Sequence, residues 1–311
     1  MLTTSDRIRG GMLGLLVGDA LGVPYEFKSP SELPSRAQIE FSPPLAFQRS
    51  HPRVVAGTWS DDGAQALCLL ASLLRHDRFD ANDFAQRLVD WYEHGYMAVE
   101  GKVFDVGIQT ARALRAIRQG AAPLDAARCD EQGNGNGALM RVLPLALWHR
   151  RTECELVADA RASSAVTHGH LRSQLCCGLY CLWVRRILRG DAEPWLGATN
   201  ALRSIIGDEP AAVAELELHI RPDLAPEHKG SGYVVDTLRS ARMLMAGGDY
   251  EEVVKSAVLL GYDTDTTAAV AGGVAGVRDG VEAIPRRWRE ALRGHELVEP
   301  LLALLVARAP H

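Results

Sequence analysis

The sequence of 311 residues lacks the features that define several protein classes. Its six cysteines contain no CxxC pair, and its net charge is −5, with no excess of lysine and arginine. No apolar stretch is long enough for a membrane-spanning helix. The sequence therefore predicts reduced thiols in a cytoplasmic protein that neither binds nucleic acid nor inserts into a membrane.

Alternating apolar and polar residues, the pattern of a half-buried strand, are also missing. Apolar residues instead recur at helical spacing, which predicts an all-α fold, a compact multi-helix bundle. The length allows two domains of ~150 residues or one large domain, and we predict a single domain over residues 1–311 because no clear linker divides the chain. The predicted helices cover residues 5–21, 62–76, 81–96, 105–119, 138–150, 152–164, 169–190, 231–247, 249–260 and 265–278, with shorter ones near 196–206 and 286–306.

Two acidic clusters lie about two hundred residues apart, and each opens an apolar helix. They are Ser60-Asp61-Asp62 and Asp263-Thr264-Asp265-Thr266. Ser, Thr and Asp are also preferred helix N-caps, so either cluster alone is more typical of a cap. Each cluster, however, offers more oxygen atoms than one cap requires. Four carboxylates would neutralise two hard divalent cations, Mg²⁺ or Mn²⁺, and the pair of clusters therefore predicts a two-metal site.

The first predicted helix carries four glycines on one stripe: Gly10, Gly14, Gly18 and Gly22. A stripe of this kind allows another backbone to pack closely. Asp19 lies in the same apolar helix and needs a polar partner. Glu26, just beyond Pro24, could project its carboxylate into a cavity, or it could form a surface ion pair.

Three loops have unusual compositions. Residues 28–59 are Pro-rich and long for a compact domain, which indicates a functional or substrate-covering segment. Residues 133–137, Gly-Asn-Gly-Asn-Gly, can cradle a phosphate at a helix start or form an ordinary turn. The pair His168 and His170 favours capping or substrate hydrogen bonding, because zinc-binding spacing is absent.

Seven segments, in this order, resemble the ADP-ribosylglycohydrolase family, particularly its dinitrogenase-reductase-activating and ADP-ribosylarginine hydrolase branch. They are residues 18–26, 57–62, 104–107, 135–141, 167–168, 231–238 and 261–269. The resemblance implies an all-α bundle with a binuclear Mg²⁺ or Mn²⁺ centre in a cleft. The positions that match the family's metal ligands are Ser60, Asp61, Asp62, Asp263, Asp265 and Thr266.

The resemblance also implies where the substrate binds. The glycine loop, Gly135, Asn136 and Gly137, matches the part that holds the ADP-ribose phosphates. His168, Tyr233 and Asp105 match positions that line the ribose pocket. Glu26 matches a catalytic or gating glutamate. Two departures, Gly63 after the paired aspartates and Ser60 in place of threonine, leave every carboxylate of the set in place.

The expected function is a metal-dependent hydrolase that removes ADP-ribose from an ADP-ribosylated protein, with arginine as the linked residue. Water would attack the anomeric carbon while Asp61 or Asp62 accepts its proton, and Asp105 would protonate the guanidine leaving group. One alternative is hydrolysis of ADP-ribosyl-serine or of small ADP-ribose conjugates. Others are an ADP-ribose-binding or immunity protein without turnover, and a structural protein of the kind found among crystallin relatives.

Overall fold

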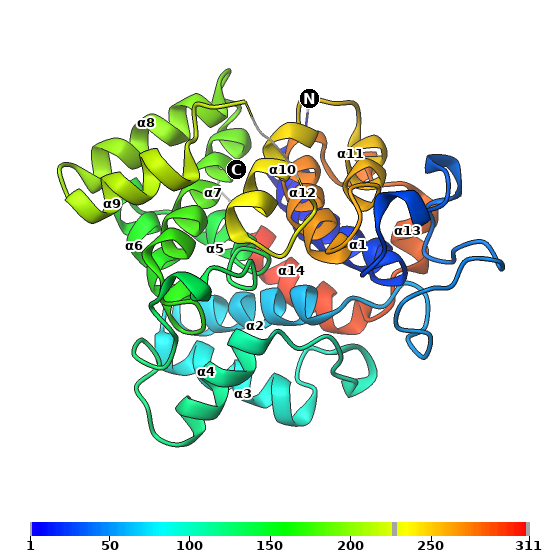
Figure 1. The fold of residues 1–311 in the computed structure, drawn as a ribbon, viewed down its shortest axis with the longest axis horizontal. Helices are drawn as coiled ribbons and strands as arrows, with labels where there is room; N and C mark the ends of the chain where they lie inside the picture. Colours follow the sequence, from blue (N-terminus) through cyan, green and yellow to red (C-terminus); the bar gives the residue numbers. More distant parts are fainter. Residues whose placement is uncertain (1, 226–228, 309–311) are drawn as a thin grey trace.

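A computed structural model describes residues 2–225 and 229–308 of the chain, so the ends of the predicted domain, residue 1 and residues 309–311, lie outside the described part. The all-α prediction is confirmed: the described residues form helices and loops without a named strand (Figure 1). The α-helices are α1 (Thr4–Gly22), α2 (Asp61–His76), α3 (Ala81–His94), α4 (Ile108–Arg118), α5 (Leu143–Trp148), α6 (Glu153–Ala165), α7 (Leu171–Arg189), α8 (Pro194–Ile206), α9 (Pro210–Ala214), α10 (Val234–Leu244), α11 (Tyr250–Val258), α12 (Thr264–Asp279), α13 (Arg286–Ala291) and α14 (His295–Ala307). Short 3-10 turns and a π-helical turn, Glu215–Ile220, connect some of them.

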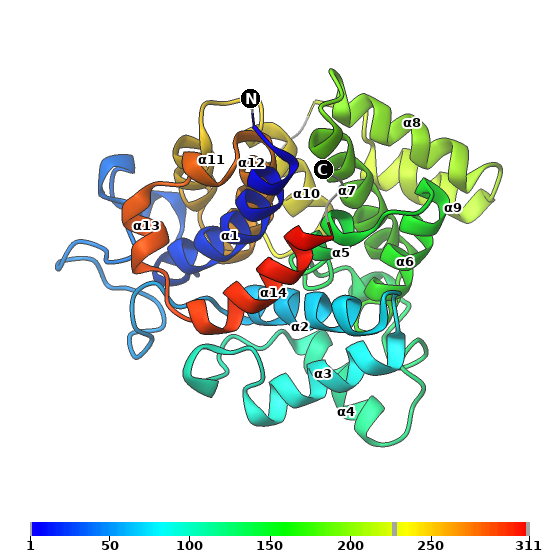
Figure 2. The same cartoon turned by 180° about the vertical axis from the view of Figure 1, so that it is seen from behind.

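Helices α1 and α12 lie side by side at the centre of the bundle, as both views show (Figures 1 and 2). The four glycines of α1 face α12, and we call this contact the glycine seam. A Cβ atom added at Gly10 or Gly18 would come within 2.2 Å of a carbonyl oxygen of α12, from Gly276 or Ala268. The two backbones therefore touch directly, which confirms the close packing that the glycine spacing predicts.

Other helices surround this central pair. Helix α2 crosses below it with α3 and α4 beneath, while α8 and α9 lie at the edge of the molecule beside α6 and α7 (Figure 1). One continuous cluster of buried apolar residues links the helices. Among the described residues, no helix is both long and apolar enough to cross a lipid bilayer.

Most predicted helix bounds differ from the structure by a few residues, and two predictions differ more. The helix expected over residues 138–150 begins only at Leu143, because residues before Pro144 form turns and proline has no N–H for an earlier helical bond. The segment 286–306 is two helices rather than one. Gly294, at φ 80°, separates α13 from α14.

Candidate functional site

A cavity of about 560 Å³ lies where the first turns of α2 and α12 meet the glycine loop. It brings together ten of the residues that the sequence analysis singled out. They are Glu26, Asp61, Asp62, Asp105, Gly135, Asn136, Gly137, His168, Asp263 and Thr266. The volume falls within the range of small-molecule sites. Segments far apart in the chain thus supply one common pocket.

The start of α2 is fixed by a carboxylate from α1. Asp19 is fully buried and accepts hydrogen bonds from the backbone N–H groups of Ser60, at 2.9 Å, and Gly63, at 2.8 Å. This is the polar partner that Asp19 requires inside an apolar helix. The Ser60 hydroxyl accepts from the N–H of Asp62 at 3.3 Å and so acts as an N-cap. These bonds hold Asp61 and Asp62 in the first turn, where both line the cavity.

The start of α12 supplies the second acidic group. Ligand atoms of Asp263, Asp265 and Glu26 all lie within 4.8 Å of one another. The Thr266 hydroxyl donates to Asp62 Oδ1 at 3.3 Å and so joins the two helix starts. The side chain of Asn136 donates to Asp263 Oδ2 at 2.8 Å. Glu26 is therefore close enough to share a cation with Asp263 and Asp265, although the sequence placed it outside the ligand set.

This arrangement of carboxylates fits divalent cations. Burial, followed by the charges of neighbouring carboxylates, raises the pKa of Asp61, Asp62 and Asp265 well above the usual range. Asp62 Oδ2 and Asp265 Oδ2 are buried and have no hydrogen-bond donor among the described residues. Buried anionic oxygens without donors are unfavourable unless a cation compensates them. An oxygen-only donor set of this kind is the type that Mg²⁺ and Mn²⁺ prefer.

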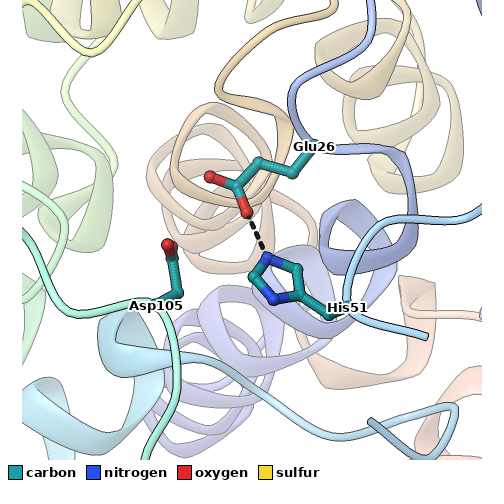
Figure 3. A group of neighbouring side chains, drawn as sticks. All are labelled: Glu26, His51 and Asp105. Carbon is teal, nitrogen blue, oxygen red and sulfur yellow. Dashed lines mark hydrogen bonds and ion pairs between the residues drawn. The ribbon is translucent and has the colours of Figure 1, made fainter. Parts of the chain in front are cut away.

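Glu26 also contacts a histidine that the sequence analysis missed. His51 Nε2 lies 2.7 Å from Glu26 Oε2, and Asp105 lies beside them (Figure 3). Burial and the charge of Asp105 raise the pKa of Glu26 to about 10. His51 comes from the long loop 28–59, so this loop does reach the site. The only signal in the sequence was the length of that loop.

Gly135 and Gly137 of the glycine loop line the cavity, and neither has a positive φ angle. Its Asn136 N–H donates to Gly232 O at 3.0 Å. The N–H groups of Gly135 and Gly137 have no acceptor among the described residues. A Cβ at Gly137 would lie 2.8 Å from Cε1 of His168. Two backbone donors at the cavity therefore remain available to a ligand, and the absence of a Cβ at Gly137 makes room for the His168 ring.

A buried chain of hydrogen bonds orients His168. Arg141 is fully buried and donates to the Thr167 hydroxyl at 2.7 Å. The same hydroxyl lies within hydrogen-bond distance of Nδ1 of His168, 2.8 Å away, and either group can be the donor. Burial lowers the pKa of His168 to about 3. The imidazole is thus neutral near pH 7, while Arg141 is a structural residue that does not line the cavity.

We expect His168 to make the protein sensitive to acid. Its folded pKa of about 3 is below the unfolded value of ~6.5, so the unfolded state takes up a proton first as the pH falls. Stability is then lost from pH ~6.5 downward. Between pH 7.5 and pH 5, urea unfolding should show the wild type losing about 2 kcal/mol more than His168→Gln. Equal losses in the two proteins would mean that His168 already takes up its proton in the folded state.

Three of the predicted site residues do not line the cavity in the structure. Tyr233 does not line this cavity, since its hydroxyl accepts from Arg172 at 3.0 Å and its backbone pairs with Gly135. Ser60 and Asp265 are buried and do not line the cavity either, although a carboxylate oxygen of Asp265 lies within 4.8 Å of those of Glu26 and Asp263. In the same region, His170 caps α7 by accepting from the N–H of Arg172, which agrees with the capping role that the sequence favours.

The family model for ADP-ribosylglycohydrolase matches residues 1–310. The chain belongs to the ADP-ribosylglycohydrolase family. It is therefore a glycohydrolase, and the branch indicated by the sequence motifs is confirmed by its relatives.

Two relatives and one solved structure show how far the similarity extends. The chain is 31% identical over 308 residues to ADP-ribosylarginine hydrolase Tri1 of Pseudomonas putida (strain GB-1), covering 98% of this chain and 79% of that one. It is 27% identical over 300 residues to ADP-ribosyl-[dinitrogen reductase] glycohydrolase of Rhodospirillum rubrum, covering 92% and 90%. A solved structure described as an ADP-ribosylglycohydrolase-related protein complex superposes with a TM-score of 0.78 at 32% identity, covering 98% of this chain and 97% of the other.

Proposed function

We propose that this glycohydrolase removes ADP-ribose from arginine side chains of ADP-ribosylated proteins and that it requires two divalent cations. The observation that carries the proposal is the convergence of the α2 and α12 carboxylates on one cavity beside the glycine loop. The arginine linkage is supported by the names of the relatives in Pseudomonas putida and Serratia proteamaculans, both ADP-ribosylarginine hydrolases.

The residues that would hold the cations are those of the two acidic clusters. We assign Asp61 and Asp62 with Ser60 from one helix start, and Asp263, Asp265 and Thr266 from the other. Glu26 is an additional candidate, because its carboxylate lies within 4.8 Å of those of Asp263 and Asp265. Such cations supply Lewis-acid polarisation of bound oxygen atoms.

The protein's own groups then account for positioning and proton transfer. The free N–H groups of Gly135 and Gly137 would donate to the phosphates of ADP-ribose, and the imidazole of His168 would lie beside them. Asp61 or Asp62 would accept the proton of the attacking water. Burial and the charge of Asp263 raise the pKa of Asp105 to about 6, and this carboxyl group, which lines the cavity, would donate the proton to the leaving guanidine.

A direct assay tests this function. The protein, treated with chelator and then given Mg²⁺, Mn²⁺ or no metal, is incubated with peptides carrying ADP-ribosyl-arginine or ADP-ribosyl-serine. We expect release of ADP-ribose from the arginine-linked peptide, and only when a divalent cation is present. Release from the serine-linked peptide alone would overturn the arginine assignment. Full activity in excess chelator would overturn the cation requirement.

A further inference from the structure

Two aromatic side chains at the cavity are exposed to solvent although they are large and apolar. Phe27 is 67% exposed and Tyr262 is 49% exposed, and both line the cavity. Among the described residues only one other Phe or Tyr side chain, Tyr233, is comparably exposed. Exposed aromatic rings that gather at a cavity are typical of a binding surface.

The backbone holds both residues in a conformation that large side chains rarely adopt. Their φ angles are 63° for Phe27 and 59° for Tyr262. The Phe27 N–H donates to Tyr262 O at 2.6 Å, and the Tyr262 N–H donates to Lys28 O at 2.7 Å. Glycine would occupy such positions without steric cost. Aromatic residues at two paired strained positions point to a use for the rings.

Phe27 and Tyr262 are each adjacent in sequence to a carboxylate residue of the proposed site. Phe27 directly follows Glu26, and Tyr262 directly precedes Asp263. The ring of Phe27 also lies against that of His51, with centroids 5.7 Å apart. His51 is bonded to Glu26 next to Asp105, the proposed proton donor to the leaving group (Figure 3). The part of the substrate nearest to these residues is therefore the group that leaves the anomeric carbon.

We propose that Phe27 and Tyr262 form an aromatic clamp that binds the guanidinium group of the substrate's arginine. This inference rests on the proposed arginine linkage. A guanidinium is planar, delocalised and weakly hydrated, and it binds the faces of aromatic rings through cation–π contacts. The clamp recognises the linked amino acid, whereas the glycine loop and the carboxylates recognise ADP-ribose.

The variant Tyr262→Gly tests the clamp without straining the backbone, because glycine adopts a φ near 59° freely. We expect its KM for an ADP-ribosyl-arginine peptide to rise by about tenfold. Its affinity for free ADP-ribose, measured by calorimetry, should equal that of the wild type. Tyr262→Phe keeps the ring and should retain the wild-type KM. Phe27→Gly should resemble Tyr262→Gly.

Asp77→Gly is the matched control, since Asp77 also has a positive φ of 53° but lies at the end of α2, outside the cavity. Its kinetics should match the wild type. An unchanged KM in folded Tyr262→Gly would overturn the clamp while the proposed function stands. Equal weakening of free ADP-ribose binding would also overturn it, because the ring would then contact the nucleotide. A wild type that does not cleave the arginine-linked peptide would instead overturn the proposed function itself.

Discussion

Asp62→Asn is expected to lower turnover by more than about a thousandfold, equivalent to ~4 kcal/mol of transition-state stabilisation, and to abolish binding of at least one cation. The substitution keeps the shape of the side chain and removes one of its charged oxygens, Oδ2, which is buried without a donor. Calorimetric titration with Mn²⁺ should show a reduced stoichiometry. In excess chelator, the variant should be at least as stable as the wild type, because one buried like charge has been removed.

A second aspartate shows whether the loss is specific to the site. Asp249 is the N-cap of α11 and accepts from the N–H of Glu252 at 3.1 Å, away from the cavity. Asp249→Asn should retain activity and cation stoichiometry, since asparagine is an equally good cap. Wild-type Mn²⁺ binding in Asp62→Asn would contradict the assignment of Asp62 as a ligand.

Gly18→Ala should destabilise the protein by about 3 kcal/mol or more, a large effect for the addition of one methyl group. The new Cβ would lie 2.2 Å from Ala268 O, and a backbone oxygen cannot rotate aside as a side chain can. Helices α1 and α12 would have to separate, and Asp19 next to Gly18 would shift away from the start of α2. Urea unfolding monitored by circular dichroism measures the change.

The same substitution in another buried helix provides the comparison. Gly178 lies inside α7, where a Cβ would meet only side-chain methyl groups, those of Val157 at 3.3 and 3.8 Å and one of Leu202 at 3.9 Å. Gly178→Ala should leave stability unchanged or raise it by up to ~1 kcal/mol, because alanine favours helix. If Gly18→Ala were as stable as Gly178→Ala, the glycine seam would not be a close backbone contact.

The features predicted well from the sequence are those encoded by local spacing. The glycines of α1 recur every four residues, which is enough to predict that they share one helix face. The acidic pairs at the starts of α2 and α12 are likewise visible within a few residues of sequence. His51 could not be predicted in the same way, since its contact with Glu26 depends on the path of a loop without periodicity. Tyr233 illustrates a third case: its motif was recognised, but the direction of its side chain depends on Arg172 in another helix.

The sequence also identified the glycine loop without showing how its donors are used. Asn136 is one example, because its N–H is bonded to Gly232 and its amide group to Asp263. Those partners lie about a hundred residues or more further along the chain. Tertiary pairing of this kind decides which of several adjacent polar groups remains available to a ligand, and local patterns do not contain that information.

The glycine seam has a consequence for how the protein is made. Gly22 and Thr264, joined by a hydrogen bond at the end of the seam, are 242 residues apart. At translation rates of about 5–20 residues per second, α1 leaves the ribosome roughly 10–50 s before α12 exists. During that interval the glycine face of α1 lacks its partner α12, and a nascent chain that stops before α12 lacks Asp263 and Asp265 of the acidic cavity. The proposed catalytic site is therefore complete only after α12 has been synthesised.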